Sequence, residues 1–364
     1  MSDDVLFEIR HMQKYFPIRG GVLGRSLGNV KAVDDINLSI RRGSTLGVVG
    51  ESGCGKTTAG RCTLMLTRPT AGNIYYEMPG NLRERMLELE AEEQALLEKD
   101  PLAKKKKKGL LPELEQMREE YALNRRSPED LRRLRKNMQI VFQDPYSSLN
   151  PRMLIKDIIA EPMKLHGLSS GINVTNRVKE LMERVGLAPE HIYRYPHEFS
   201  GGQRQRIGVA KALALNPNFI VLDEPTSALD VSVQSQILNL LNDLQRELDL
   251  TYMFISHDLS TIKYMCDTVC IMYLGKIAEI GDKKAIFDRP LHPYTEALLN
   301  SIPVPDPKLK RKRVPLSGDI PSPANPPKGC RFHTRCKYRE AICEEIEPQL
   351  EDKGNGHLVA CHFR

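Results

Sequence analysis

A glycine-rich segment near the start of the chain has the residue types and spacing of a phosphate-binding loop. Residues 50–57 read GESGCGKT and match the pattern G-x-x-x-x-G-K-[ST]. Glycines let the backbone curl so that its N–H groups point at phosphate oxygens, and a following helix adds its positive N-terminus. In such a loop Lys56 places its charge on the β- and γ-phosphates, and the Thr57 hydroxyl binds Mg²⁺. The residues expected to contact the nucleotide here are Gly50, Ser52, Gly53, Cys54, Gly55, Lys56, Thr57 and Thr58.

The alternative for this segment is a chance glycine-rich turn. That alternative does not explain the strand-like run at 45–49 directly before it, or the helix expected directly after it. Cys54 lies at an unconstrained position of the pattern, so we interpret it as a small residue that fills space rather than a nucleophile.

A pair of carboxylates follows a second apolar run and completes the expected site. Residues 219–222 read FIVL, which is typical of a buried parallel strand, and Asp223 and Glu224 come directly after it. Ligands of open α/β sheets bind at this end of the strands. We expect Asp223 to orient Mg²⁺ through its water ligands and Glu224 to polarise a water for attack on the γ-phosphate. An acidic surface turn is the alternative, and the accompanying phosphate loop disfavours it.

Strands that alternate with helices are needed to position these residues. Apolar runs between turn residues predict strands at 6–10, 36–40, 45–49, 74–76, 138–142, 219–222 and 252–256, and an edge hairpin that begins at 269–273. Helical spacing predicts helices at 203–215 and 231–248, and most of 150–196 also reads as helical. This alternation favours an α/β fold with a largely parallel sheet.

Four further motifs resemble those of ABC-type ATPases. Residues 199–206 read FSGGQRQR and resemble that family's signature motif, in which leucine is the commoner first residue. Gln143 in VFQDP matches its Q-loop, Asp230 in SALD its D-loop, and His257 after a strand its switch histidine. The motifs follow the family's order, and the resemblance covers about residues 5–290. It implies a P-loop NTPase of ABC type, with a parallel-sheet core, an antiparallel β-subdomain and a helical signature subdomain.

The resemblance implies an ATPase whose sites are shared between two subunits. In the family, Ser200, Gly201, Gly202 and Gln203 would cap the γ-phosphate held by the partner, because a helix N-terminus favours anions. ATP then stabilises the closed pair and hydrolysis reopens it. The implied catalytic residues are Glu224, His257 and Gln143, the implied Mg²⁺ residues are Thr57, Gln143 and Asp223, and Asp230 also joins the nucleotide site.

The adenine is expected to stack on an aromatic residue near the N-terminus. The segment Lys14-Tyr15-Phe16 is similar to the family's short Lys-x-aromatic pattern, which favours Phe16, with Tyr15 as the second choice. Alternatively, both aromatic side chains only pack within the β-subdomain.

Three stretches resemble the ATPases of oligopeptide and dipeptide importers: 48–58, 142–152 and LHPYT at 291–295. The FSGGQRQR form is similar to the second, F-type, of their two ATPase subunits. The implied partners are a second ABC ATPase subunit, two transmembrane permease subunits and an extracellular substrate-binding protein, with this chain peripheral on the cytoplasmic face of the cell membrane. Importers of nickel complexes and of oligosaccharides belong to the same subfamily, so the substrate stays open.

Four of the eight cysteines lie close to the C-terminus, which marks that end as separate. They are Cys330, Cys336, Cys343 and Cys361. No membrane-spanning run or secretory signal is visible, so we expect a cytosolic protein, in which such cysteines are thiols or metal ligands rather than disulfides. The spacing lacks the short pairs of zinc fingers. Similar tails in peptide-importer ATPases are associated with a [4Fe–4S] cluster, which needs four thiolates; zinc and free thiols stay open, with His333, His357 and His362 as substitute ligands or mere neighbours.

The positive charge is local. The chain has 364 residues and a net charge of +6. The basic runs at 104–108 and 308–313 together carry ten positive charges, so the rest of the chain is mildly acidic. A nucleic-acid partner is not expected, because phosphate backbones need clustered positive charge on a folded surface, and no aromatic residues interleave with the first run.

A charged insert is this chain's departure from the family. Apolar residues recur at helical spacing in 82–96 and 110–121, on either side of the first basic run, which predicts two antiparallel helices. Their charged faces are interpreted as solvated, and a loop that faces a partner or the membrane is the lesser hypothesis. The second basic run lies in a Pro-rich linker.

The expected domains are an ABC ATPase domain at 1–290 and a C-terminal extension with the cysteine cluster at 291–364. The first includes the insert within 75–135 and a helical subdomain at about 144–215. One rival function is a soluble, non-transport ABC ATPase acting on nucleic acid or ribosomes, but such proteins usually carry two cassettes or a long coiled coil. Another is a non-enzymatic redox-sensing binder, against which Lys56, Glu224 and His257 argue.

Overall fold

The computed structural model describes residues 4–20, 25–99, 111–168, 174–301 and 318–364. Both basic runs, 104–108 and 308–313, lie outside the described residues.

An eight-stranded mixed sheet forms the centre of the structure, in the order β10-β11-β9-β8-β3-β7-β6-β5. The strands from β8 to β5 are parallel neighbours, and β9, β11 and β10 continue the sheet in antiparallel register. Their bounds are β3 Thr45–Val49, β5 Met138–Val141, β6 Phe219–Asp223, β7 Thr251–Ser256, β8 Thr268–Tyr273, β9 Lys276–Asp282, β10 Glu351–Asp352 and β11 Leu358–Val359. Every residue of β3, β6 and β7 is buried, as expected for parallel strands covered on both faces.

The hairpin of β8 and β9 was predicted at the sheet edge, and this prediction is wrong. The C-terminal tail supplies β11, whose Leu358 and Val359 pair with Ile280 and Glu279 of β9. The C-terminal tail therefore adds strands β11 and β10 to the central sheet. Two-residue strands carry too little pattern to be seen in a sequence.

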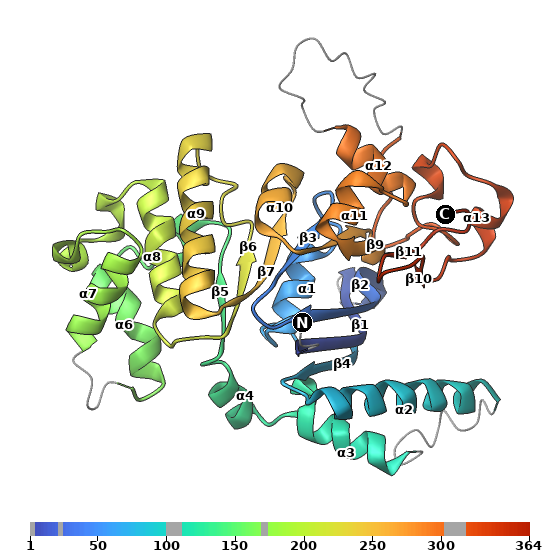
Figure 1. Cartoon of the computed structure of the whole chain (residues 1–364), viewed down its shortest axis with the longest axis horizontal. Coiled ribbons are helices and arrows are strands. Elements are labelled where there is room, and N and C mark those ends of the chain that lie inside the picture. The colour runs from blue at the N-terminus through green and yellow to red at the C-terminus, as the bar shows by residue number, and fades with distance from the viewer. Residues whose placement is uncertain (1–3, 21–24, 100–110, 169–173, 302–317) are drawn as a thin grey trace, which may run out of the picture.

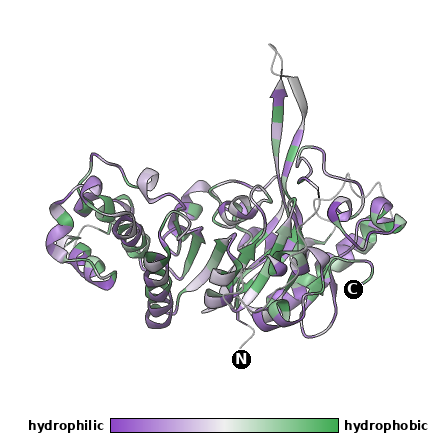
Figure 2. Ribbon diagram, turned by 90° about the horizontal axis from the view of Figure 1, so that it is seen from above, coloured by the Kyte–Doolittle hydropathy of each residue, from purple (hydrophilic) through white to green (hydrophobic). Residues whose placement is uncertain are grey.

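A second, three-stranded antiparallel sheet has the order β2-β1-β4, with bounds β1 Val5–Gly20, β2 Arg25–Arg41 and β4 Ala71–Tyr76. The strands predicted at 6–10 and 36–40 are present but far longer, because β1 and β2 pair from Val5↔Arg41 to Gly20↔Arg25. Figure 2 shows their far ends standing out from the body as a two-stranded ribbon.

Helices surround the central sheet, and a further group of helices lies beyond its β5 edge (Figure 1). The group α5–α8 lies beyond β5 and corresponds to the helical segment predicted from the sequence. Their bounds and those of the remaining helices outside the insert are α1 Lys56–Thr63, α5 Pro145–Ser148, α6 Ile155–Leu165, α7 Val174–Arg184, α8 Gly201–Leu213, α9 Val231–Leu248, α10 Leu259–Met265, α11 Lys283–Asp288, α12 Pro293–Asn300 and α13 Ala341–Glu345. Short 3₁₀ turns are η2 Leu123–Arg125, η3 Pro189–Tyr193, η4 Pro196–Glu198 and η5 His333–Arg335.

The charged insert folds as α2 (Gly80–Lys99), α3 (Pro112–Tyr121) and α4 (Pro128–Leu134), and α2 and α3 lie beside β4 (Figure 1). Its charged residues are only partly solvated. Arg118 is buried and donates to Glu93 at 2.8 and 3.1 Å and to Glu115 at 2.8 Å. Glu90, also buried, accepts hydrogen bonds from Arg10 of β1 and Tyr75 of β4, so an ion pair and a neutral hydrogen bond fasten the insert to the small sheet.

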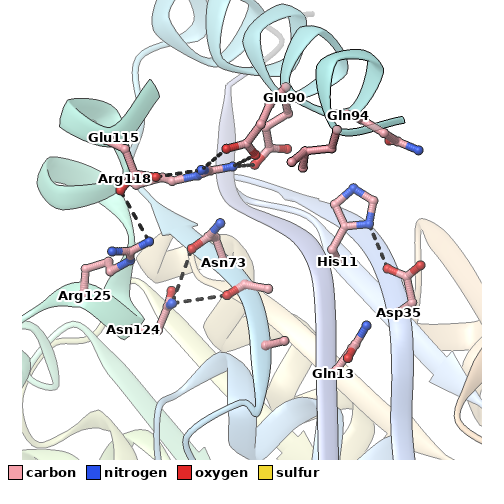
Figure 3. Close-up of a pocket in the computed structure, with 14 residues that line it drawn as sticks. His11, Gln13, Asp35, Asn73, Glu90, Gln94, Glu115, Arg118, Asn124 and Arg125 are labelled. Atoms are coloured by element: carbon pink, nitrogen blue, oxygen red, sulfur yellow. Dashed lines mark hydrogen bonds and ion pairs between the residues drawn. The ribbon is translucent and has the colours of Figure 1, made fainter. Parts of the chain in front are cut away.

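A cavity of about 620 Å³ lies between this insert and the small sheet (Figure 3). Its walls include Glu90, Glu93, Arg118, His11 and Asp35, and they contain none of the residues predicted for the nucleotide site. The cavity therefore belongs to the insert and not to the expected chemistry.

Candidate functional site

The phosphate loop connects β3 to α1, and its backbone conformation depends on glycine. Gly55 has φ +106°, and a Cβ there would lie 2.1 Å from the carbonyl oxygen of Ala32. A Cβ on Gly50 would lie 2.1 Å from the carbonyl oxygen of Met272. Neither position has room for a side chain, so the loop presses directly against neighbouring backbone and opens its other side to solvent.

Lys56 begins α1 and is almost fully buried. Its ammonium donates to the carbonyl oxygens of Gly50 at 2.7 Å and Glu51 at 3.0 Å, which closes the loop around the side chain. Cys54 is also buried, and burial raises the pKa of its thiol. It is thus protonated at neutral pH, consistent with the interpretation that it fills space.

Thr57 and Asp223 meet between the loop and the end of β6. The Thr57 hydroxyl donates to the Asp223 carboxylate at 2.8 Å. Asp223 is 2% exposed, and burial raises its pKa. A bound divalent cation would offset that desolvation, and hydroxyl and carboxylate oxygens are ligands that Mg²⁺ accepts. Thr57 and Asp223 therefore suit the Mg²⁺ position expected from the sequence.

Glu224 is turned out of the strand by an unusual backbone conformation. Its φ is +47°, in the left-handed region that non-glycine residues rarely occupy, and its N–H donates to the Ile255 carbonyl of β7 at 2.9 Å. Gln143 Nε2 and His257 Nδ1 both donate to Glu224 Oε2, at 3.0 and 3.1 Å. Gln143, Glu224 and His257, which were predicted from separate motifs, thus meet at one carboxylate oxygen of Glu224.

The signature and D-loop residues lie together in another part of the molecule. Ser200 caps α8: its hydroxyl accepts from the Gln203 N–H at 3.3 Å, and the Gln203 side chain accepts from the Ser200 N–H at 3.0 Å. Asp230 caps α9 by accepting from the Val233 N–H at 2.9 Å, and Gly202 packs so closely on Val233 that a Cβ would lie 2.4 Å from it. In Figure 1, strands β5–β7 lie between α8 and α1, so the signature residues at the start of α8 are far from the chain's own phosphate loop.

Two aromatic residues on β1 were candidates for the adenine. The Tyr15 hydroxyl donates to Asp34, and burial raises the pKa of Tyr15. Phe16 is 40% exposed, and the Lys14 ammonium lies 5.0 Å from its ring centroid. The Phe16 ring is the more exposed of the two, and its role in stacking stays a prediction.

The four C-terminal cysteines line one cavity of about 20 Å³. Burial raises the pKa of Cys330 to about 11, and Cys336 Sγ accepts the Tyr338 N–H at 3.4 Å. Within the described ranges, no three Cys, His, Asp or Glu side chains form a group that could hold a metal ion.

The three neighbouring histidines are engaged elsewhere. His333 donates to the Cys330 carbonyl, His362 to the Ile346 carbonyl and His357 to Glu279. His333 and His362 border the cysteine cavity, whereas His357 is absent from its walls.

Sequence reasoning missed how the C-terminal tail reaches the phosphate loop. The LHPYT segment was noticed as a motif, but no contact was predicted for it. Tyr294 lies in its helix α12, and its hydroxyl accepts the backbone N–H of Glu51 at 3.0 Å. The separation of 243 residues leaves no local signal of this contact.

Comparison with known proteins agrees with this geometry. A family model described as "ABC transporter" matches residues 33–227. The chain belongs to the ABC transporter family. It is an ABC-type ATPase, for which ATP and Mg²⁺ are the implied ligands. A second model, "Oligopeptide/dipeptide transporter, C-terminal region", matches residues 278–343 of this ABC ATPase.

Curated relatives resemble the ABC ATPase over its whole length. "Oligopeptide transport ATP-binding protein AppF" from Bacillus subtilis (strain 168) is 47% identical over 100% of this chain and 98% of its own. "Dipeptide transport ATP-binding protein DppF" from Escherichia coli (strain K12) is 43% identical over 98% and 93%. This similarity confirms the resemblance to peptide-importer ATPases that the motifs indicated.

Solved structures show the same fold. A dimeric, post-hydrolysis structure of the ATP-binding cassette MJ0796 with ADP and Pi has a TM-score of 0.58 at 22% identity, covering 76% of this chain and 99% of that one. The cbiO1 protein from Clostridium perfringens has a TM-score of 0.56 at 22% identity, covering 79% and 92%. The predicted ABC-type α/β fold is confirmed. Throughout the described segments, no helix is both long and apolar enough to cross a membrane.

Proposed function

We propose that this ABC ATPase powers the import of dipeptides or oligopeptides through a membrane transporter complex. The observation that carries the proposal is the similarity to peptide-transport ATP-binding proteins along the whole chain, including the match of residues 278–343 to the peptide-transporter C-terminal region. We further propose the division into an ABC ATPase domain at 1–290 and an extension at 291–364, which supplies β11 to the sheet of the first.

The proposed chemistry is hydrolysis of ATP by an activated water. The Lys56 ammonium would give up its hydrogen bonds to the carbonyl oxygens of Gly50 and Glu51 and bind the β- and γ-phosphates instead, because a phosphate oxygen is the stronger acceptor for an ammonium group. Thr57, Asp223 and Gln143 would hold Mg²⁺, which neutralises charge on the phosphates. Glu224 would accept the proton of the attacking water, and His257, on the same oxygen, would orient the carboxylate.

We propose that a second ABC ATPase subunit completes each site. Ser200, Gly201, Gly202 and Gln203 start α8 away from the chain's own loop, so they would cap the γ-phosphate on the partner (Figure 1). Asp230 caps α9 next to them and would lie at the same interface. A peptide-type importer would add two permease subunits, on whose cytoplasmic side the ATPases dock, and an extracellular substrate-binding protein. Phe16 would stack on the adenine of the chain's own nucleotide.

Reconstitution tests this function. The chain, its paired ATPase and the permease subunits are placed in liposomes, and ATP hydrolysis is measured as loaded binding protein is added. We expect hydrolysis to rise when the binding protein carries a di- or oligopeptide and a radiolabelled peptide to enter the vesicles. Stimulation only by a nickel complex or an oligosaccharide would replace peptide as the substrate class. Hydrolysis that no membrane component changes would favour a soluble ABC ATPase.

We also propose that the C-terminal cysteines hold a thiolate-bound metal centre, with an iron–sulfur cluster as the expected occupant. The support is the convergence of Cys330, Cys336, Cys343 and Cys361 on one cavity, together with an N–H donor to the Cys336 sulfur. Iron–sulfur clusters use four thiolates and backbone donors of this kind. The cavity measures about 20 Å³, and among the described residues no three side chains are grouped closely enough to hold a metal ion, so either a cluster or a single zinc ion would require the cysteine side chains to move together.

Anaerobic purification distinguishes these occupants. We expect a brown protein with a broad absorbance band near ~400 nm and iron and sulfide in equal amounts, as cysteine-ligated clusters give. Cys343→Ser should bleach the band, and Cys62→Ser, which changes a buried cysteine of α1, should leave it intact. A colourless protein with one zinc ion would show that the cysteines hold zinc and not a cluster. A metal-free protein would show that the four cysteines are free thiols.

A further inference from the structure

The C-terminal tail holds the phosphate loop at both the backbone and the side chain of one residue, Glu51. Tyr294 of α12 accepts the backbone N–H of Glu51, as described above. Arg335 donates to both carboxylate oxygens of Glu51, at 2.6 and 3.1 Å. Glu51 is the second residue of the loop sequence GESGCGKT, and its carbonyl oxygen accepts the Lys56 ammonium. The loop is therefore connected to residues more than 240 positions away in the chain.

Arg335 is fixed in place by its surroundings. Its side chain is 5% exposed, and it lies over the Tyr273 ring, 5.8 Å from the centroid. Tyr273 packs against Tyr294 and Phe332, with ring centroids 4.8 and 5.3 Å away. Three segments thus meet in one aromatic cluster beside the loop: the end of β8, the start of α12 and the cysteine region. A buried guanidinium held this way loses little entropy when it forms a two-point ion pair.

The charge of Glu51 explains why such a partner is useful. A carboxylate inside a phosphate loop repels a nucleoside triphosphate, and the repulsion is strong where water is partly excluded. The bidentate bond from Arg335 neutralises this charge, and the same hydrogen bonds raise the pKa of Arg335, so that it stays protonated. With the ion pair made, the loop presents its N–H groups and Lys56 without a competing negative charge.

We propose that Arg335 is a positioning residue for ATP binding: it neutralises and orients Glu51, so that the C-terminal tail sets the nucleotide affinity of the phosphate loop. Tyr294 assists by fixing the Glu51 backbone. Neither residue would touch the nucleotide, since both act through Glu51.

A double-mutant cycle on the full-length chain tests this role. Affinity for a fluorescent ATP analogue with Mg²⁺ is measured for Arg335→Met, Glu51→Gln and the double variant. We expect Arg335→Met to weaken binding about tenfold, because it leaves an unpaired carboxylate in the loop. Glu51→Gln in the same chain should restore the affinity to within about twofold of wild type, because the repulsive charge is then gone. A merely structural role of Arg335 predicts no such rescue.

The control is Lys337→Met. Lys337 lies on the other side of Cys336 and pairs with Glu296 at 2.9 Å on the surface, so its loss should leave the affinity unchanged. If Arg335→Met does not fold, Arg335→Lys takes its place, with about threefold weaker binding expected because the second hydrogen bond is lost. Unchanged affinity in the Arg335 variant, or a double variant as weak as the single one, would overturn the proposal.

Discussion

Replacing Glu224 by glutamine is expected to lower the rate of ATP hydrolysis by about 100- to 1,000-fold while ATP still binds. The amide oxygen of glutamine can accept the same hydrogen bonds that Glu224 Oε2 accepts from Gln143 and His257, so the geometry of the site is kept. What is lost is the ability to accept a proton from the attacking water. The variant should therefore accumulate in the ATP-bound, closed state.

Turnover by the assembled complex and the oligomeric state with ATP are the measurements. In the variant, ATP should shift the paired ATPases to a dimer that survives gel filtration, whereas the wild type hydrolyses its ATP and reopens. Glu247→Gln is a matched control, because Glu247 lies on α9 with 62% of its side chain exposed, 3.9 Å from Arg184. Wild-type turnover in Glu224→Gln would refute the assignment of Glu224 as the base, and His257 would then be the next candidate.

The parts of this site that could be predicted from the sequence are those with a local signal. The phosphate loop, the strand before Asp223 and the helix that begins after Ser200 each lie within about ten residues of their own motif, where spacing and burial pattern are informative. The confluence of Gln143, Glu224 and His257 was expected only through the family resemblance, since spacing alone cannot place three segments around one oxygen atom.

What the sequence could not predict are contacts between segments far apart in the chain. Burial of Glu90, Glu93 and Arg118 contradicts the expectation that the charged faces of the insert are solvated, because a charged residue is read as exposed unless its partners are known. The pairing of β11 with β9 and the bond from Arg335 to Glu51 belong to the same class. The positive φ of Glu224 could likewise not be predicted from the sequence, since glutamate is not a residue type that favours this conformation.

Substitution of Gly55 by alanine is expected to remove nucleotide binding and to destabilise the fold. Its φ of +106° strains any L-residue, and the added methyl group would lie 2.1 Å from the backbone carbonyl oxygen of Ala32 in strand β2. Strain and overpacking together cost about 2–4 kcal/mol of the free energy of unfolding. The structure can relieve the clash only by moving Gly55, and α1 begins at the next residue, Lys56. Affinity for the ATP analogue should therefore fall more than about 100-fold, because the loop N–H groups and Lys56 move together.

Two other glycines separate the causes of that loss. Gly53 also has a positive φ, +78°, but a Cβ there meets nothing within 4 Å, so Gly53→Ala should show strain alone, about 1 kcal/mol. Gly208 lies within α8 with open space around it, so Gly208→Ala should stabilise the helix by about 0.5–1 kcal/mol. Thermal unfolding without nucleotide should rank the variants Gly208→Ala, wild type, Gly53→Ala and Gly55→Ala from most to least stable. Equal unfolding temperatures for Gly53→Ala and Gly55→Ala would show that the contact between position 55 and Ala32 is relieved without loss of stability. The close packing of the loop against β2 would then not be what fixes the position of the loop N–H groups.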